Sequence, residues 1–199
     1  MLLSWSPALF IGYNSIKFDE HLLRQAFYKS LHPPYLTNTN GNSRSDALRM
    51  VQAASVFAPD ALVFPVDDNG QRVFELERIA PLNGLAHQNA HDALADVEAT
   101  IFLCRKIMER APDLWSTFMQ FSQKATVVDH ISAEDVFSLS DFYFGNHYSW
   151  PVTTIGSNPR NSSEYYVYNL AIKPQDLATA TDEDLNRTLG KLLRISISF

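Results

Sequence analysis

The sequence predicts an α/β protein with a helix-rich first part and a mostly β second part. In the first part, a short apolar run precedes stretches whose apolar residues recur every three or four positions, as on one face of a helix. After Pro112, short segments rich in β-branched and aromatic residues alternate with turns of Asn, Ser and Gly, which is typical of a small antiparallel sheet or barrel. We place the domain boundary at this change, near residues 110–120.

The first predicted element is a strand. "ALFIGYN" at residues 8–14 is a short apolar run ended by Gly12 and Asn14, which indicates a strand buried on both faces. Asp19 is expected to cap a helix over residues 20–31. The apolar spacing predicts a buried helix face made of Leu22, Leu23, Ala26, Phe27 and Leu31.

A loop, a turn and two helices follow. Asn, Gly and Ser in residues 37–45 predict a polar loop. Asp46 then begins a helix over residues 47–57. "DDNGQ" at 67–71 predicts a tight hairpin turn, and residues 74–85 a short helix.

The last helix of the first part is predicted over residues 90–110. Its expected buried face consists of Leu94, Val97, Ile101, Cys104 and Met108. Cys104 is interpreted as a core residue. As the single cysteine it excludes an internal disulfide and suits a reducing compartment.

The second part is predicted to be a small sheet followed by a helix. Its β-branched and aromatic segments are the expected strands, namely 125–130, 136–144, 151–157 and 164–170. A final helix is expected from about Thr181.

Composition and charge narrow the function classes. The 199 residues are 46% hydrophobic and 12% aromatic, enough for a packed core. The net charge of −6 does not by itself favour nucleic acid, although an acidic protein can hold a local basic groove. No apolar run approaches the roughly 20 residues that span a bilayer, and the opening lacks the basic region of a signal peptide. We therefore expect a soluble cytoplasmic protein without a membrane partner.

The stretch "NAHDALADVEAT" at 89–100 carries a histidine and three acids on an otherwise apolar helix. On spacing alone, a solvated helix face is the simpler interpretation, because acids in a first turn complement the helix dipole. The alternative is a metal-dependent phosphodiesterase, in which carboxylates hold Mg²⁺ and a histidine takes a proton from water. A zinc site of His87, His91 and Asp96 is disfavoured, because His87 falls in the preceding loop and the chain lacks HExxH.

Three sequence segments, taken in order, resemble the exodeoxyribonuclease I family. They are "GYNSIKFDEHLLRQAFY", "NSRSDALRMVQA" and "NAHDALADVEAT". These are 3′→5′ exonucleases of the DEDD class that degrade single-stranded DNA. The resemblance covers nearly the whole chain. It implies that residues 1–112 are the later part of a ribonuclease-H-like exonuclease domain. Residues 118–199 would then form an incomplete SH3-like domain.

The resemblance also implies roles for individual residues. Asp19, in "FDE", matches the second exonuclease motif, and Asp96 matches the last metal-binding residue of the third motif. His91 matches the general base of that third motif, and Asp92 is interpreted as supporting it. The implied cofactor is a pair of Mg²⁺ ions, for which Mn²⁺ can substitute.

The family pattern further includes parts outside these residues. Its first motif is a strand carrying Asp-x-Glu, which lies upstream of the position that Gly12 matches. In this sequence only eleven residues precede Gly12. We therefore expect a partial chain that is an inefficient nuclease alone, because Mg²⁺ depends on anionic ligands. Without neighbouring strands, we also expect partly uncovered apolar helix faces and self-association. The rival hypothesis is a non-catalytic fragment that binds single-stranded nucleic acid or a partner.

The expected DNA contacts are less closely tied to a motif. Arg24 and Arg44 could neutralise phosphates, and Tyr148 and Trp150, within "FGNHYSW", could stack on bases. Glu75 stands where the family is expected to have a basic residue. The partners that the resemblance implies are single-stranded DNA, single-stranded DNA-binding protein and the rest of a longer polypeptide.

Overall fold

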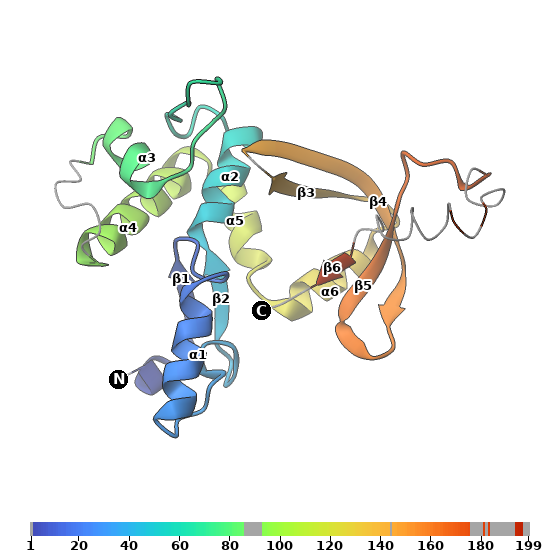
Figure 1. Ribbon diagram of the computed structural model, residues 1–199, viewed down its shortest axis with the longest axis horizontal. Helices are drawn as coiled ribbons and strands as arrows, with labels where there is room; N and C mark the ends of the chain where they lie inside the picture. The colour runs from blue at the N-terminus through green and yellow to red at the C-terminus, as the bar shows by residue number, and fades with distance from the viewer. Residues whose placement is uncertain are drawn as a thin grey trace. The chain divides into compact units, whose positions relative to one another are not determined.

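A computed structural model describes residues 2–85, 93–143, 145–175, 181 and 183, and the backbone of 194–196. The chain divides into two compact units, the first ending at Gln123 and the second beginning at Lys124. The first unit holds a short parallel sheet and several helices, and the second a helix and an antiparallel sheet (Figure 1).

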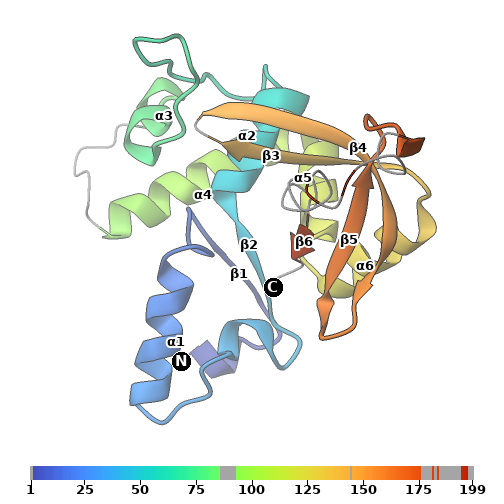
Figure 2. The ribbon, with the colours of Figure 1, turned by 45° about the vertical axis from the view of Figure 1, so that its right-hand side comes forward.

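The sheet of the first unit pairs β1 (Leu9–Gly12) with β2 (Ser43–Asp46) in parallel, with Leu9 opposite Ser43 and Gly12 opposite Asp46. Figure 2 shows the two strands side by side. The prediction of a loop over 37–45 was therefore wrong for residues 43–45, which belong to β2. Residues 43–46 are polar and show no apolar alternation, so periodicity does not mark them as a strand.

The connection between the two strands contains α1 (Asp19–Lys29) and a short 3₁₀ helix, η2 (Leu36–Asn38). Another short 3₁₀ helix, η1 (Leu2–Trp5), precedes β1. The prediction that Asp19 caps this helix was wrong, because Asp19 is already helical. The N-cap residue is Phe18, which makes no side-chain cap hydrogen bond.

The predicted burial of β1 and α1 was also wrong. Ile11 of β1 is 38% exposed, and on α1 Leu22 is 55% exposed. Leu31, just after α1, is 94% exposed. Within the described residues the sheet has two strands, which is too little to cover these apolar faces. The expectation of partly uncovered helix faces agrees with this exposure.

The core of the first unit lies among four helices. They are α2 (Ala47–Phe57), α3 (Leu76–Leu82), α4 (Ala93–Arg110) and α5 (Pro112–Gln120). The α4 helix packs against the other three. Met50, Val51 and Ile79 are fully buried in this core, so α2 and α3 each contribute an apolar face. The predicted helix over 47–57 is confirmed.

The α4 helix turns a different face to the core from the one predicted. Leu94, Val97, Ile101 and Met108 are exposed. The buried residues are Ala99, Thr100, Leu103 and Ile107. Both sets have helical spacing, so periodicity alone could not choose between them. Cys104 lies between the two faces and is half-buried against the core.

The predicted tight turn at 67–71 is confirmed. An antiparallel bridge joins Val66 to Arg72, and the backbone N–H of Gly70 donates to the carbonyl of Asp67. The Asp67 carboxylate accepts from the backbone N–H groups of Asn69 and Gln71 at 2.9 and 2.8 Å. This side chain therefore supplies turn hydrogen bonds that the backbone alone cannot make.

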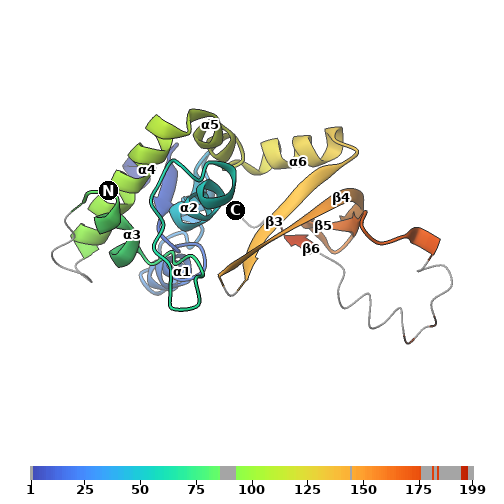
Figure 3. The same cartoon turned by 90° about the horizontal axis from the view of Figure 1, so that it is seen from above.

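The second unit packs α6 (Lys124–Ala133) beside a four-stranded antiparallel sheet (Figure 3). The strand order is β3 (Phe137–Tyr143), β4 (Asn146–Asn158), β5 (Asn161–Asn169) and β6 (Arg194–Ser196). Ile131, Val152 and Val167 are buried in its core. The Oγ1 of Thr154 donates to the carbonyl of Ile131 at 3.2 Å, which ties β4 to α6.

The predictions for this unit are confirmed in three segments and wrong in one. The strands expected at 136–144, 151–157 and 164–170 correspond to β3, β4 and β5. Residues 125–130 form α6, although Val127 and Val128 favour a strand, because packing overrides local β propensity. The helix expected from about Thr181 lies almost wholly outside the described residues.

Among the described residues, no helix is long and apolar enough to cross a membrane.

The orientation of α4 predicts a large loss of stability when one of its apolar residues is truncated and a small loss for another two positions away. Leu103→Ala should lower the free energy of unfolding by about 2–5 kcal/mol, because Leu103 is fully buried and its truncation leaves a cavity. Ile101→Ala should change it by less than about 1 kcal/mol, because this side chain is 45% exposed. Urea unfolding of the two variants measures both. A larger loss for Ile101→Ala would contradict this orientation of α4.

Candidate functional site

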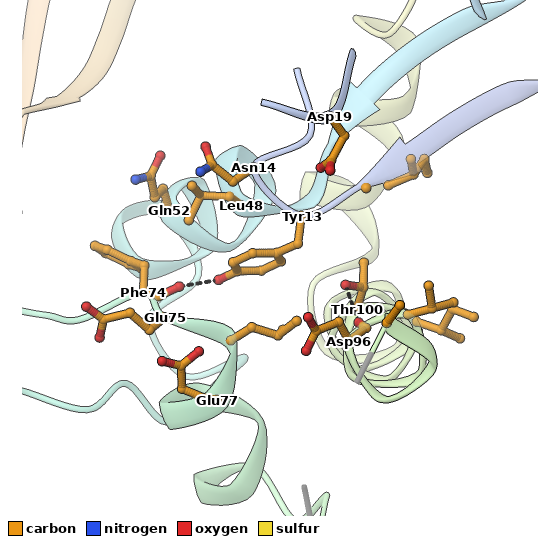
Figure 4. A pocket seen from close by; sticks show the side chains of 16 residues that line it. Tyr13, Asn14, Asp19, Leu48, Gln52, Phe74, Glu75, Glu77, Asp96 and Thr100 are labelled. Carbon is orange, nitrogen blue, oxygen red and sulfur yellow. Dashed lines mark hydrogen bonds between the residues drawn. The ribbon is translucent and has the colours of Figure 1, made fainter. Parts of the chain in front are cut away.

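A pocket of about 790 Å³ opens where the end of β1 and the start of α1 meet α2, α3 and α4. Figure 4 shows it from close by. Its lining combines apolar and aromatic side chains with four carboxylates, those of Asp19, Glu75, Glu77 and Asp96. No basic side chain is among the described residues that line it. Such a pocket attracts cations and repels free phosphate.

Asp19 and Asp96 enter this pocket from different elements (Figure 4). Asp19 is the first residue of α1, and Asp96 lies in the first turn of α4. Both carboxylates therefore lie at the N-terminal, positive end of a helix dipole. The structure brings these two together despite their separation in sequence. His87, His91 and Asp92 lie outside the described residues.

The turn that carries Asp19 into the pocket is tight. A Cβ on Gly12 would lie 2.6 Å from the Cβ of Ser15, so this position requires glycine. Asn14 has a left-handed backbone with φ of 57°. The buried carboxylate of Asp46 accepts hydrogen bonds from the backbone N–H groups of Asn14 and Ile16. Asp46 was predicted only as the start of α2, so its contact with this turn was missed.

Tyr13 crosses the pocket from β1 toward α3. Its hydroxyl donates to the carbonyl of Phe74 at 2.5 Å (Figure 4). Burial raises the pKa of Tyr13, and the carboxylates of Asp46 and Glu75 raise it further. Tyr13 thus remains a neutral hydrogen-bond donor at physiological pH.

The donor set of the pocket fits a hard cation in part. Carboxylate oxygens from separate elements are the ligands that Mg²⁺ and Mn²⁺ take in proteins. Asp19 and Asp96 supply two of them, and the described residues contain no group of three or more His, Cys, Asp or Glu placed to hold a metal ion. Further ligands would have to come from water, from substrate or from residues beyond those described.

Arg44 has a different environment from the one predicted. Its side chain is buried, and Nη1 donates to Oε2 of the buried Glu20 at 2.7 Å. The same Oε2 accepts from the hydroxyl of Thr37 at 2.9 Å. This charge is compensated inside the unit, so its burial favours a structural role for Arg44 over the predicted DNA contact. Arg44 lies in the interior because β2 pairs with β1 and its residues 44–46 are buried.

Arg24 remains partly accessible. Its guanidinium lies 5.1 Å from the centre of the Tyr35 ring, and its Nε is 3.9 Å from Oε2 of Glu20. The side chain is 29% exposed. Arg24 can therefore present part of its charge to solvent while one face rests on an aromatic ring.

The two predicted aromatic residues of the second unit lie on one face of β4, because Ser149 separates them. The rings of Tyr148 and Trp150 are stacked, with centres 6.0 Å apart and planes at 8°. Tyr143 of β3 extends the row, with its ring centre 6.1 Å from that of Tyr148. Tyr143 and Tyr148 are 52% and 44% exposed. Such a row offers ring faces on which bases can stack.

Burial raises the pKa of the Cys104 thiol to about 11. The thiol is therefore protonated and a poor nucleophile at neutral pH, which favours its interpretation as a packing residue.

Comparison with known proteins places these features in context. No protein-family model matches the chain. It is 32% identical over 186 residues to exodeoxyribonuclease I of Haemophilus influenzae, spanning 90% of this chain and 39% of that protein. It is 30% identical over 167 residues to exodeoxyribonuclease I of Escherichia coli, spanning 81% and 35%. The chain thus spans less than half of the length of these relatives.

Solved structures show the same relationship. Escherichia coli Exonuclease I in complex with a dA16 oligonucleotide matches with a TM-score of 0.77 and 27% identity, over 90% of this chain and 39% of that one. The complex of ExoI with SSB-Ct matches with a TM-score of 0.77 and 25% identity, over 94% and 43%. The mixed α/β fold is therefore shared with this region of exonuclease I.

The buried ion pair predicts the effect of removing Arg44. Arg44→Met should lower the free energy of unfolding by about 3–5 kcal/mol, because the buried Glu20 would lose its nearest charged partner. Adding Glu20→Gln should recover most of the loss. Arg105→Met, at an exposed position, serves as the control and should have little effect. Chemical unfolding measures all three. If Arg44→Met weakened oligonucleotide binding at unchanged stability, the DNA-contact interpretation would return.

Proposed function

The chain is homologous to a region of the exodeoxyribonuclease I family, and from this premise we propose that it serves 3′→5′ hydrolysis of single-stranded DNA. The observation that carries the proposal is the meeting of Asp19 and Asp96 in one acidic pocket. The two residues come from the two words of the sequence that match exonuclease motifs. A shared pocket is the arrangement that a common metal site requires.

In this proposal the pocket residues hold and orient the reacting groups. Asp19 and Asp96 would bind divalent cations, with two Mg²⁺ ions in the complete site and Mn²⁺ as a substitute. The bound metal supplies activated water and neutralises charge on the phosphate. His91 would take the proton of the attacking water, which requires a pKa near neutrality.

The substrate and partners follow from the same premise. Single-stranded DNA is the proposed substrate. In this proposal Tyr148 and Trp150 stack on bases, and Arg24 neutralises phosphates of the DNA. A single-stranded DNA-binding protein is the proposed protein partner, as the ExoI complex with SSB-Ct supports. We place this activity in DNA repair in the cytoplasm. The first unit would be the later part of a ribonuclease-H-like domain and the second the start of an SH3-like domain.

A second candidate function is binding of single-stranded nucleic acid without cleavage. The observation that favours it is the partly exposed aromatic row of the second unit, in which Tyr148 and Trp150 are stacked and which needs no metal. The two candidate functions differ in whether they require the carboxylate of Asp96. Cleavage requires its carboxylate, whereas base stacking does not.

The nuclease proposal predicts that the 199-residue chain digests a 3′-labelled single strand poorly with Mg²⁺, since it supplies only two of the carboxylates that match exonuclease motifs, Asp19 and Asp96. A version extended upstream by a strand with Asp-x-Glu should digest it. In that version Asp96→Ala should abolish turnover, and His91→Ala should slow it by about 10²–10⁴-fold. Glu98→Gln, an exposed position on the same helix, should have no effect. Full activity of the short chain would show that Asp19 and Asp96 suffice.

The aromatic row predicts a separate loss of binding. Tyr148→Ala should weaken the binding of an oligo-dT strand by about 1–3 kcal/mol for each base that loses its stacking partner. Ser149→Ala, the neighbour on the opposite face of β4, should leave binding unchanged. Fluorescence anisotropy without added metal measures the affinity for the oligo-dT strand apart from any contribution of the metal site. Equal affinities for both variants would remove Tyr148 and Trp150 from the proposed interface.

A further inference from the structure

We infer that Asp46 is a positioning residue that sets the place of Asp19 in the acidic pocket, an inference that rests on the proposed metal-binding function of Asp19. Asp46 ends β2 and lies opposite Gly12, the last residue of β1. It is 6% exposed. Its carboxylate therefore sits where the turn from β1 to α1 passes the start of α2.

Each oxygen of this carboxylate has its own partners. Oδ1 accepts from the backbone N–H of Asn14 at 2.7 Å and of Leu48 at 3.1 Å. Oδ2 accepts from the backbone N–H of Ile16 at 3.2 Å. One buried side chain thus joins two points of the turn to the first turn of α2. Hydrogen bonds to a charged acceptor are stronger than neutral ones, so this junction is held firmly.

The turn transmits this position to Asp19 through its backbone. The carbonyl of Ser15, next to Ile16, accepts from the N–H groups of Phe18 and Glu20 at 3.3 and 3.0 Å. These bonds bracket Asp19. A shift of Ile16 would therefore move the first turn of α1 and, with it, the Asp19 carboxylate.

A purely local role for Asp46 would be to cap α2. Such a cap uses one acceptor oxygen, which Ser or Asn provides about equally well. The bond from Ile16 to the second oxygen is not needed for the cap. Asp46→Asn separates the two roles, because the amide can keep its oxygen toward Asn14 and Leu48 while its NH₂ group faces the N–H of Ile16.

Asn83 offers a matched control elsewhere in the first unit. Its side chain joins Val63 to α3, with its oxygen accepting from the N–H of Val63 and its NH₂ group donating to the carbonyls of Val63 and Ile79. It is 5% exposed and does not line the acidic pocket. Asn83→Asp is the reverse isosteric change and places an oxygen against these carbonyls, so it tests general destabilisation.

The experiment measures Mn²⁺ binding to the full 199-residue chain by electron paramagnetic resonance, together with thermal unfolding and backbone hydrogen exchange. Asp46→Asn should raise the Mn²⁺ dissociation constant roughly 10-fold or more, as loss of a residue that orients a metal ligand does. It should also speed exchange at residues 14–19. Asn83→Asp should lower the melting temperature and leave Mn²⁺ affinity unchanged.

The outcomes separate this inference from the function it rests on. If Asp96→Ala abolishes Mn²⁺ binding but Asp46→Asn leaves both binding and exchange unchanged, the positioning role is wrong and the metal site stands. If Asn83→Asp weakens Mn²⁺ binding as much as Asp46→Asn, the effect is general destabilisation and the inference fails. If the unaltered chain binds no Mn²⁺ that depends on Asp96, this inference fails, and digestion by the upstream-extended version then decides the proposed function.

Discussion

Burial of the polar strand β2 constrains the rest of the first unit. Residues 44–46 are all buried, and the charged groups of Arg44 and Asp46 need partners because burying an unpaired charge costs free energy. Arg44 pairs with Glu20 of α1, and Asp46 pairs with the turn ahead of α1. Just before the strand, Asn42 accepts from Ala8 and donates to the carbonyl of Leu36. These bonds fix β1, α1 and η2 around one strand.

The same constraint explains why two distant acids share a pocket. Asp46 and Gly12 hold the turn that brings the start of α1 to the end of β1. The α4 helix reaches the pocket by a different route, since Ala99, Leu103 and Ile107 seat it in the apolar core. Asp19 is therefore placed by polar contacts and Asp96 by apolar packing. A site built in this way depends on both kinds of interaction at once.

The second unit is organised by a different principle. Ile131, Val152 and Val167 form a small apolar core between α6 and the sheet. Farther along β3 and β4, the aromatic side chains extend past this core and contact one another instead. Aromatic rings are large and stiff, so they can keep a defined arrangement while partly exposed. This leaves stacked ring faces available at the surface of the unit.

The sequence by itself determined the elements whose pattern is local. Asp46 marked the start of α2, β-branched and aromatic composition identified β3 to β5, and Asp67 with Gly70 identified the turn. It also indicated the family, because the words around Asp19 and Asp96 stand in order. The tertiary structure alone decided three other features. Spacing predicted the wrong face of α4, and only packing selected the one with Leu103. Propensity favoured a strand at Val127 and Val128, and packing made a helix.

Polarity suggested a loop and a DNA contact at Arg44, and only the fold supplied Glu20 as its buried partner. In each of these three cases, the deciding interaction joins residues far apart in the chain. Periodicity and propensity describe near neighbours, so they cannot show which distant group completes a buried charge or covers an apolar face.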